Sequence, residues 1–591
     1  MTRNIGGLLF AVIVITSSGQ DVAAATYTAA SCNESDVQAT ITHATHDGDL
    51  VIIPAGTCIW TTTLSSTFSN SITIQGAGAQ YATDGGASTA GSDQTVIVDQ
   101  MNHNAKGLPP TWPIITTAGK SLRITGIAFI QNSSSLAAAN GVVRIDGGSA
   151  AVRVDHCHFY SYPSGNKDLL IQGSVLGVAD HNFFDARPGI VTNDMVFNSY
   201  YRSGGGHASW ADTDRFGTSQ FFFAEDDFFS YGWVTDCHYG GRYVIRHSTG
   251  SNTKLANHGL SGDAGRSCRA MEFYQNNFTY ASPYFPNLVG INGGSALIWG
   301  NTTTGHINIV QTDIPRKNNF TYAQNPAPNM WGYCGPAPYT TGTASVGAGS
   351  TAVTGSGFST SWPSGSMFYL PGASCTVNNR TGPTCKISSV NSSTSITLAT
   401  PASVAVSNGK YTVGSPWDAN TNAKGHPCMD SPARGAGDLL SGGSFANTTN
   451  PTTSAPSWPH QVLDPIYVWA NAYHPSGSVN DAIAHDNSGM LTDNVDYYQQ
   501  FGPGSFGEPG TFNGSAGVGS GTLAPNDPSN SAYPNAPHCT PQVGYWDTTN
   551  NTLYQCTATD TWTAYYTPYP YPHPLTQASI SPPTQLAATA Q

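Results

Sequence analysis

The feature that most constrains the fold of this chain is a short segment that recurs along it. Its clearest copy, RVDHCHF at Arg153–Phe159, combines strand-forming residues with a polar residue at a fixed position. Further copies lie at Arg123–Phe129, Val178–Phe184, Phe223–Phe229, Val244–Gly250, Phe273–Thr279, Ile298–Thr303 and Val468–His474. A strand this short cannot bury its apolar side chains alone, so the copies must stack on one another. The repeat therefore predicts an all-β fold, a parallel β-solenoid.

One polar position of each copy forms a column when the segments are aligned. The column contains His156, His181, Asp226, His247, Asn276 and Asn301, at steps of 25, 45, 21, 29 and 25 residues. The step of 45 predicts two coils, because Met195–Ser199 supplies a strand between them. Asparagine and aspartate suit the turns since they tolerate left-handed backbone. We therefore expect Asn182, Asn276, Asn277 and Asn301 to form a structural ladder.

The N-terminus predicts export. Arg3 precedes an apolar run, Ile5–Ile15, and small residues end at Ala25. A charged start, a short apolar core and small residues before the cut are typical of a signal peptide, here residues 1–25. The run is too short to span a bilayer comfortably, and no later stretch replaces it. We expect a secreted protein whose first ordered element, a helix within Asn33–Ala44, shields the open end of the solenoid.

Cysteine spacing agrees with an oxidising destination. Close spacing among the 11 cysteines predicts three local bridges, Cys32–Cys58, Cys375–Cys385 and Cys539–Cys556. Cys334 with Cys428 would close the base of an insertion. Cys157, Cys237 and Cys268 remain, and at least one of them must stay free.

Composition divides the chain into five parts. The β-helix is expected over 26–340 and again, with loops, over 415–500. Between them, residues 341–414 alternate Ser, Thr and Val with almost no charge, which predicts an inserted small β-sandwich or barrel. This module is either a carbohydrate-binding unit or a spacer. Residues 501–591 are rich in Gly, Pro and Tyr and predict an extended strap, packed on the scaffold or stacking sugars.

A basic island interrupts this charge-poor, acidic chain. Charged residues make up 10% of the sequence and the formal charge is −13. The island contains Arg242, Arg246, Lys254, Arg266 and Arg269, with His247 and His258 among them. Its local charge favours an anionic or polyhydroxylated partner, an extracellular polysaccharide, while the global charge argues against nucleic acid or anionic membrane. Alternatively, these arginines tie loops to carbonyl groups.

Two stretches resemble the pectate lyase superfamily. The first matches its DHC strand, its G-x-x-D turn and the N-x-F strand one coil later, through Asp155, His156, Cys157, Gly165, Asp168, Asn182 and Phe183. The second, RSCRAMEFYQNNF, is similar to the arginine-rich strand that carries the elimination arginine in that family. The resemblance implies a right-handed parallel β-helix and a polysaccharide lyase-like activity, with Arg266 or Arg269 near the reacting sugar.

Elimination from a uronic acid polymer needs a cation on the carboxylate and a base for the adjacent proton. His258 is the favoured base because it can titrate near neutrality on a Gly-rich loop, and Arg266 or Arg269 comes next. The other catalytic candidates are Arg246, His247 and Lys254. Substrate contacts are expected from Arg242, Asp236, Tyr239 and Glu272. The hypothesis includes a Ca²⁺ cofactor held by Asp168, Asp180 and Asp185.

Two other functions stay open at this point. Hydrolysis would need two carboxylates about 5–9.5 Å apart. Glu225, Asp226 and Asp227 could pair with Asp236 or with Glu272 on neighbouring coils. A non-catalytic glycan-binding or adhesive surface protein would also suit a long solenoid. The oligomeric state is left open.

Overall fold

The computed structural model describes most of the chain. Described are residues 23–105, 107–190, 192–201, 205–253, 255–257, 267–280, 287–305, 308–312, 341–362, 364, 366–377, 380–382, 384–414, 430–438, 460–474, 483–485, 491–500, 512–531, 533 and 536–577. The expected signal peptide lies outside these residues except for its last three positions. No helix of the described part is long and apolar enough to cross a membrane.

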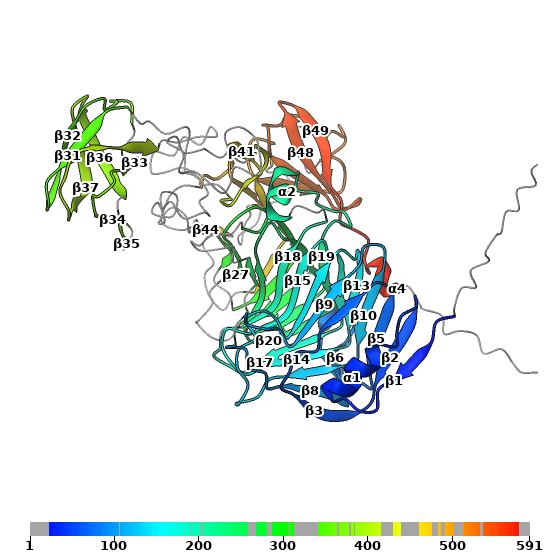
Figure 1. The fold of residues 1–591 in the computed structure, drawn as a ribbon. Coiled ribbons are helices and arrows are strands. Elements are labelled where there is room, and N and C mark those ends of the chain that lie inside the picture. Colours follow the sequence, from blue (N-terminus) through cyan, green and yellow to red (C-terminus); the bar gives the residue numbers. More distant parts are fainter. Residues whose placement is uncertain are drawn as a thin grey trace, which may run out of the picture.

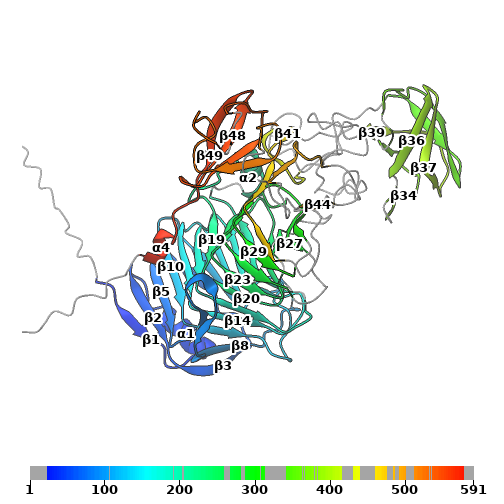
Figure 2. The ribbon, with the colours of Figure 1, turned by 180° about the vertical axis from the view of Figure 1, so that it is seen from behind.

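Long parallel sheets dominate the fold (Figures 1 and 2). Sheet A contains β1 (Thr26–Thr28), β2 (Asp49–Ile53), β5 (Ile72–Gly76), β10 (Ser121–Thr125), β13 (Ala151–Asp155), β16 (Gly177–Asp180), β19 (Phe222–Glu225), β22 (Arg242–Arg246), β25 (Ala270–Tyr274), β28 (Ser295–Trp299), β42 (Ile466–Trp469) and β45 (Tyr497–Gln499). Sheet B contains β3 (Gly56–Trp60), β8 (Thr95–Asp99), β11 (Ala128–Ile130), β14 (His158–Ser161), β17 (Phe183–Ala186), β20 (Phe228–Ser230), β23 (Thr249–Ser251), β26 (Asn277–Thr279), β29 (Thr302–Thr304) and β43 (Ala472–His474).

Two further parallel sheets complete the coils. Sheet C contains β4 (Ser66–Phe68), β9 (Trp112–Thr116), β12 (Val143–Gly147), β15 (Lys167–Gly173), β18 (Asn193–Ser199) and β21 (Trp233–Cys237). Sheet D contains β24 (Leu255–Asn257), β27 (Asn287–Ile291), β30 (Asn308–Thr312) and β44 (Ile483–His485), and β24 packs against β21. The strands confirm the all-β prediction. Because the chain passes through sheets C, A and B in turn, the sheets are consistent with a parallel β-helix.

The core runs through the stack as columns of like residues. In sheet A one inward column is Ile124, Val154, Ala179, Ala224, Ile245, Phe273, Ile298 and Val468, paired strand by strand. In sheet B, Phe129, Phe159, Phe184 and Phe229 stack with ring centroids 5.0–5.2 Å apart. All of these side chains are buried in one cluster. Stacking removes from water the apolar area that no single coil could bury.

The turn from sheet A to sheet B carries two polar columns, and this corrects the predicted alignment. His156, His181, Asp226, His247 and Gln275 share one register position, and all have positive φ. Asn276 and Asn301 lie one residue later, in the buried column with Asn182. The misalignment arose because Phe273 and Val244 are both apolar, yet Phe273 points inward and Val244 outward. Outward positions here are covered by the C-terminal segment, so the polar–apolar alternation is lost.

The buried column is an asparagine ladder. Asn301 Oδ1 accepts hydrogen bonds from the backbone and the side-chain nitrogens of Asn276, at 3.1 and 3.0 Å. Asn471 accepts the same two bonds from Asn301. Asn277 is exposed on β26 and does not belong to the ladder.

The step of 45 residues between His181 and Asp226 is one coil, not two. β16 pairs directly with β19, and the strand at Met195–Ser199 is part of β18 in sheet C. The extra length forms a loop with helix α2 (Gly205–Ala211).

Smaller elements surround the stack. Helix α1 (Glu34–Ile41) packs Val37 and Ile41 into the core beside β1 and β2. A hairpin of β6 (Gln80–Ala82) and β7 (Thr89–Gly91), with the short helix η1 (Asp84–Gly86), lies at the A–B turn, where Ala82 donates to the His181 carbonyl. β40 (Arg434–Asp438) and β41 (His460–Leu463) pair antiparallel.

Residues 343–414 form an antiparallel β unit with its own hydrophobic cluster. The sheet contains β31 (Thr343–Val346), β32 (Ser350–Gly355), β33 (Met367–Tyr369), β36 (Thr384–Ser392), β37 (Ser395–Ala402), β38 (Val406–Lys410) and β39 (Thr412–Gly414). A separate pair, β34 (Cys375–Val377) and β35 (Arg380–Gly382), adjoins it.

The C-terminal region covers the outer face of sheet A. β46 (Val518–Gly521), β47 (Gly544–Asp547), β48 (Thr552–Ala558) and β49 (Thr561–Tyr566) form a small sheet. Its aromatic side chains join Trp299, Tyr467 and Trp469 of sheet A in one buried cluster. The sequence predicts only an extended strap here. The aromatic residues of this region pack on sheet A, whose outer face is formed by residues far away in the sequence. From here on, the word strap is used only for the final segment, Thr567–Gln577. It ends in α4 (Pro574–Gln577) beside β13 and β16 (Figures 1 and 2).

The described residues form four disulfides, which fit an extracellular protein. Cys32–Cys58, Cys375–Cys385 and Cys539–Cys556 confirm the three pairs predicted from spacing. Cys237 is bonded to Cys268, and Cys157 is free and buried. Cys334 and Cys428 lie outside the described residues.

Candidate functional site

Arg246 of the basic island is enclosed. Its guanidinium donates to Glu225 Oε2 at 2.7 Å and to the Tyr274 hydroxyl at 2.8 Å. The strap supplies two more acceptors, the carbonyls of Tyr569 and Pro570. With no exposed surface, Arg246 is closed to a polymer in this conformation.

Arg242 and Arg269 hold loops in place, as the alternative interpretation of the island expects. Arg242 donates to the carbonyls of Ser209 and Thr213 beside α2, and burial together with Arg269 lowers its pKa to about 9. Arg269 donates to the Asp212 carbonyl at 3.0 Å and forms an ion pair with Asp464 at 2.7 Å. Both side chains are fully buried, so neither can face a substrate carboxylate here.

His247 and Glu272 also lie beneath the C-terminal region. The His247 ring stacks on Tyr571 with centroids 3.6 Å apart, and burial with the nearby Arg246 charge lowers its pKa to about 4. Glu272 accepts from the Gly217 amide and the Tyr566 hydroxyl, and burial raises its pKa to about 7. These groups are partnered within the protein rather than open to a ligand.

Three candidates, Lys254, His258 and Arg266, lie outside the described residues. In the sequence, Lys254 precedes and His258 follows β24, the strand that packs against β21.

The three aspartates expected to hold calcium do not converge. Asp180 lies in sheet A and receives two hydrogen bonds from Arg153, at 2.8 and 2.7 Å. Asp168 and Asp185 lie in sheets C and B. No group of three His, Cys, Asp or Glu side chains among the described residues could hold a metal ion. The three predicted aspartates therefore do not form a calcium site in this structure.

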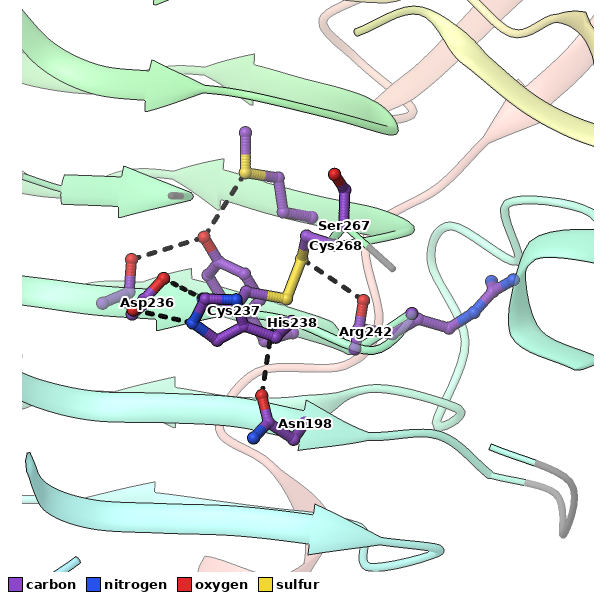
Figure 3. Close-up of a disulfide and its surroundings, with 12 residues drawn as sticks. Asn198, Asp236, Cys237, His238, Arg242, Ser267 and Cys268 are labelled. Atoms are coloured by element: carbon purple, nitrogen blue, oxygen red, sulfur yellow. Dashed lines mark hydrogen bonds and ion pairs between the residues drawn. A yellow bond between two sulfur atoms is a disulfide. The ribbon is translucent and has the colours of Figure 1, made fainter. Parts of the chain in front are cut away.

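The outer face of sheet C presents an open row of polar side chains. Asp146 and Asn198 lie at matching positions of β12 and β18, with Gln172 of β15 between them. Each is partly exposed. His238 continues the row after β21, where its amide donates to Asn198 Oδ1 (Figure 3). Since adjacent strands lie about 4.8 Å apart, the row from Asp146 to His238 is about 14 Å long.

The row ends after β21 in an aspartate–histidine pair. His238 Nε2 lies 2.8 Å from Asp236 Oδ2, and the other carboxylate oxygen accepts from the Cys237 amide at 2.9 Å. Within the described part of the chain, His238 Nδ1 is buried without a hydrogen-bond partner. Tyr239 follows with positive φ and 51% of its surface exposed. Hydrogen bonds to the protein thus orient the imidazole and leave one nitrogen free.

The Cys237–Cys268 disulfide fixes this end of the row (Figure 3). It links β21 to the segment before β25, and Ser267 and His238 form an isolated β-bridge. Figure 3 also shows Arg242 extending away from Asp236 and His238. The predicted substrate contacts are thereby divided: Asp236 and Tyr239 share this site, whereas Arg242 and Glu272 do not.

The other end of the row, on β12, carries a partly exposed ion pair. Arg144 donates to Asp146 Oδ2 at 3.0 Å, and Gln172 donates to the same oxygen at 2.8 Å. Although partial burial opposes it, hydrogen bonds from Arg144, Gln172 and Gly147 lower the pKa of Asp146. A lowered pKa keeps Asp146 ionised, which suits sugar hydroxyl groups better than proton donation.

Carboxylate spacing on this face does not favour hydrolysis. Asp146 and Asp236 lie three strands apart, about 14 Å at 4.8 Å per strand. Glycosidases hold their two carboxyl groups within about 9.5 Å. Asp146 and Asp236 therefore cannot act on one glycosidic bond.

Five residues of this face were not predicted from the sequence, namely Arg144, Asp146, Gln172, Asn198 and His238. A signal was present, because Asp146, Gln172 and Asn198 follow one another at steps of 26 residues, close to the period of the main repeat. It was overlooked because these strands lack the aromatic ending of the RVDHCHF copies.

A scan against protein-family models finds no match for this chain, and a search of curated proteins finds none either. Function must therefore be inferred from the geometry of the site.

Proposed function

We propose that this protein is a secreted polysaccharide lyase that acts by β-elimination along the outer face of sheet C. The observation that carries the proposal is the in-register polar row of Asp146, Gln172, Asn198 and His238, which ends at a carboxylate-oriented imidazole beside the exposed Tyr239. An extended polymer can follow such a row from coil to coil. Planar polar groups bind sugar hydroxyls, and an exposed tyrosine ring can pack on a sugar ring.

The chemistry assigned to this site is proton abstraction beside a uronate carboxylate. A base takes the proton, and the electron pair of the broken carbon–hydrogen bond forms a carbon–carbon double bond. The bond between carbon and the leaving sugar oxygen breaks, and that oxygen gains a proton. Asp236 holds Nε2–H of His238, which leaves the Nδ1 lone pair to act as the base once substrate binding uncovers this buried atom. His258 is the second candidate because it follows β24 in the sequence. Lys254 and Arg266 stay the predicted cations for the carboxylate.

A product assay tests the proposal. The purified chain is incubated with a panel of uronic acid polymers, and the ultraviolet absorbance of an unsaturated uronate is followed together with new reducing ends. Elimination produces both signals. Reducing ends without the absorbance would assign hydrolysis instead, and polymer binding with neither signal would assign a non-catalytic protein.

One observation favours that non-catalytic alternative. Arg242, Arg246 and Arg269 are buried, so none of them stands ready to neutralise a uronate carboxylate. A glycan-binding or adhesive surface protein needs no such cation.

The proposal also covers the family, the handedness of the β-helix and the roles of α1 and of the unit at 343–414. We place the chain in the pectate lyase superfamily with a right-handed β-helix, on the resemblance around Asp155–Cys157 and Asp168. α1 would shield the end of the stack, since it packs beside β1 and β2. The unit at 343–414 would be an inserted module that binds carbohydrate or acts as a spacer.

A further inference from the structure

The outer face of sheet A is covered in two different ways. Under the small sheet β46–β49 it is aromatic and apolar, with Trp299, Tyr467 and Trp469 at the contact. Under the strap it is charged and polar, with Arg153 on β13 and with Glu225 and Arg246 on the adjacent strands β19 and β22. A permanent cover gains more from apolar partners, because buried ion pairs often stabilise a fold less than hydrophobic residues of similar volume.

The strap binds this charged strip mainly through its backbone. The carbonyls of Tyr569 and Pro570 accept from Arg246, and the amide of His573 donates to Glu225 Oε1 at 2.7 Å. Arg153 reaches the Thr576 carbonyl at 3.4 Å. These bonds do not depend on the side chains of the strap, so another extended chain with acceptor oxygens for the arginines and a hydroxyl donor for Glu225 could make them.

Aromatic rings of the strap fill the spaces between these bonds. Tyr569 lies 5.1 Å from Phe223, centroid to centroid, and Tyr571 stacks on His247. The Tyr571 hydroxyl donates to Asp226 at 2.7 Å, although 43% of the residue is exposed. A chain of sugar rings likewise presents apolar C–H faces beside acceptor oxygens.

The strip continues beyond the strap as partly exposed residues. On the two coils before Asp226, the rings of His156 and His181 stack at 5.2 Å with an interplanar angle of 7°. Their Nδ1 atoms are held by Asp155 and Asp180 at 2.9 and 3.0 Å. A ligand could first contact this open part and then extend along the strip.

We infer that the strap, Thr567–Gln577, is a reversible cover, and that the strip of sheet A beneath it, around Arg153, Glu225 and Arg246, is a second binding site for an extended acidic polysaccharide. Only the class of polymer rests on the proposed function, because the site is separate from sheet C. Oxygens of the polymer replace the strap carbonyls on Arg153 and Arg246, which keep their ion pairs with Asp180 and Glu225. A polymer hydroxyl donates to Glu225 in place of the His573 amide. The strap therefore competes with polymer for the same donors.

Hydrogen exchange on the full chain tests the cover directly. The His573 amide should exchange through local opening, well before the buried amides of β22. Adding a homogeneous oligogalacturonate should then speed exchange at His573, because bound polymer keeps the strap displaced. Exchange at His573 only on global unfolding, or slower exchange with the oligomer, would overturn the inference.

A binding measurement gives the second test. Tyr571→Ala removes one ring contact and one hydrogen bond of the strap, so the open state gains population and the apparent Kd for the oligomer should fall about tenfold. The matched control is Tyr27→Ala, a partly buried tyrosine at the other end of sheet A, which should change nothing. Measured in a His238→Ala background, the gain cannot come from turnover. An unchanged Kd with the fold intact would sink the inference.

The two proposals fail separately. Tighter oligomer binding by Tyr571→Ala without turnover on any uronate polymer would keep the second site and reject the lyase. Turnover by the wild type with no effect of Tyr571→Ala would keep the lyase and reject the second site.

Discussion

Asp168 of β15 lies opposite Asp194 of β18, and both carboxyl groups are fully buried between in-register neighbours. Asp168 Oδ1 accepts from Ser161 and Asn166, while its Oδ2 and both Asp194 oxygens lack hydrogen-bond partners among the described residues. Two facing acids in such a place cannot both ionise cheaply. Burial raises the pKa of Asp168 to about 7 and that of Asp194 well above its usual range.

This pair should make the fold weaken as pH rises. A carboxyl group whose pKa is raised on folding stabilises the protein fully below its unfolded pKa, and the contribution is lost as pH rises through the folded value. For Asp168 that window runs from about pH 4 to 7, and its upper limit is on the order of 4 kcal/mol. Asp194→Asn stays neutral, so it should flatten the decline of Tm between pH 5 and 7 in a thermal melt.

The charged groups around the pair set the controls. Asp185 and, through it, His158 face the pair from sheet B. Glu272 titrates near pH 7 elsewhere, so Asp194→Asn should leave a residual slope. The exposed Asp47→Asn should leave the profile unchanged. A wild-type Tm that does not fall between pH 5 and 7 would contradict the prediction.

The asparagine ladder offers a comparison between adjacent residues. Asn276 is buried and donates to the Ile245 carbonyl and to Asn301, whereas Asn277 is exposed. Asn276→Ala leaves the Ser248 amide and the Ile245 carbonyl without these bonds and should cost about 2–4 kcal/mol in the free energy of unfolding. Asn277→Ala should stay within about 0.5 kcal/mol. Denaturant titration of both variants checks this, and equal losses would remove the ladder's special role.

The stacked fold could be predicted from the sequence because each coil repeats the same burial problem. The copies around Asp155, Asp180 and Glu225 align in the structure as they do in the sequence. Alignment failed at Phe273, where the C-terminal cover makes outward positions apolar. It also failed at the 45-residue step, since a loop inserted in one coil and an additional coil have the same length. Both errors depend on contacts between residues far apart in the sequence.

The site could be predicted only in part, for a related reason. Local sequence shows that Arg242, Arg246 and Arg269 are clustered, but it does not show that Asp212, Asp464 and the strap enclose them. Asp236 and Tyr239 were found because they flank the island. The rest of the row on sheet C becomes visible only when strands 26 residues apart are placed side by side.

The enclosed arginines should behave as structural residues. Arg269→Ala leaves Asp464 buried without its ion-pair partner and should cost about 3–5 kcal/mol in unfolding free energy. The partly exposed Arg144→Ala should cost at most about 1 kcal/mol. Unfolding curves by circular dichroism measure both. An Arg269→Ala variant that folds normally and loses only turnover would restore the catalytic role expected from the sequence.

Arg266 is predicted to differ from Arg269. If Arg266 supplies the cation for the substrate carboxylate, Arg266→Ala should abolish turnover with little change in Tm. Arg266→Lys keeps the charge but not the planar donor pair and should recover part of the rate. A fall in Tm together with the loss of rate would make Arg266 structural as well.

The decisive prediction concerns His238, and the chain offers a matched control. His238 and His156 each bond an aspartate close by in the sequence, Asp236 and Asp155, but they lie on different faces of the stack. As the base, His238 should lose about 10²–10⁴-fold in kcat when replaced by alanine. His156→Ala should keep kcat, because His156 lies on the separate strip of sheet A and does not touch the reacting sugar. Asp236→Asn should lower kcat less than His238→Ala, because the imidazole stays in place but loses the carboxylate that fixes its tautomer. Initial rates on the polymer found by the product assay measure all three variants, and equal rates for His238→Ala and wild type would move the chemistry away from sheet C.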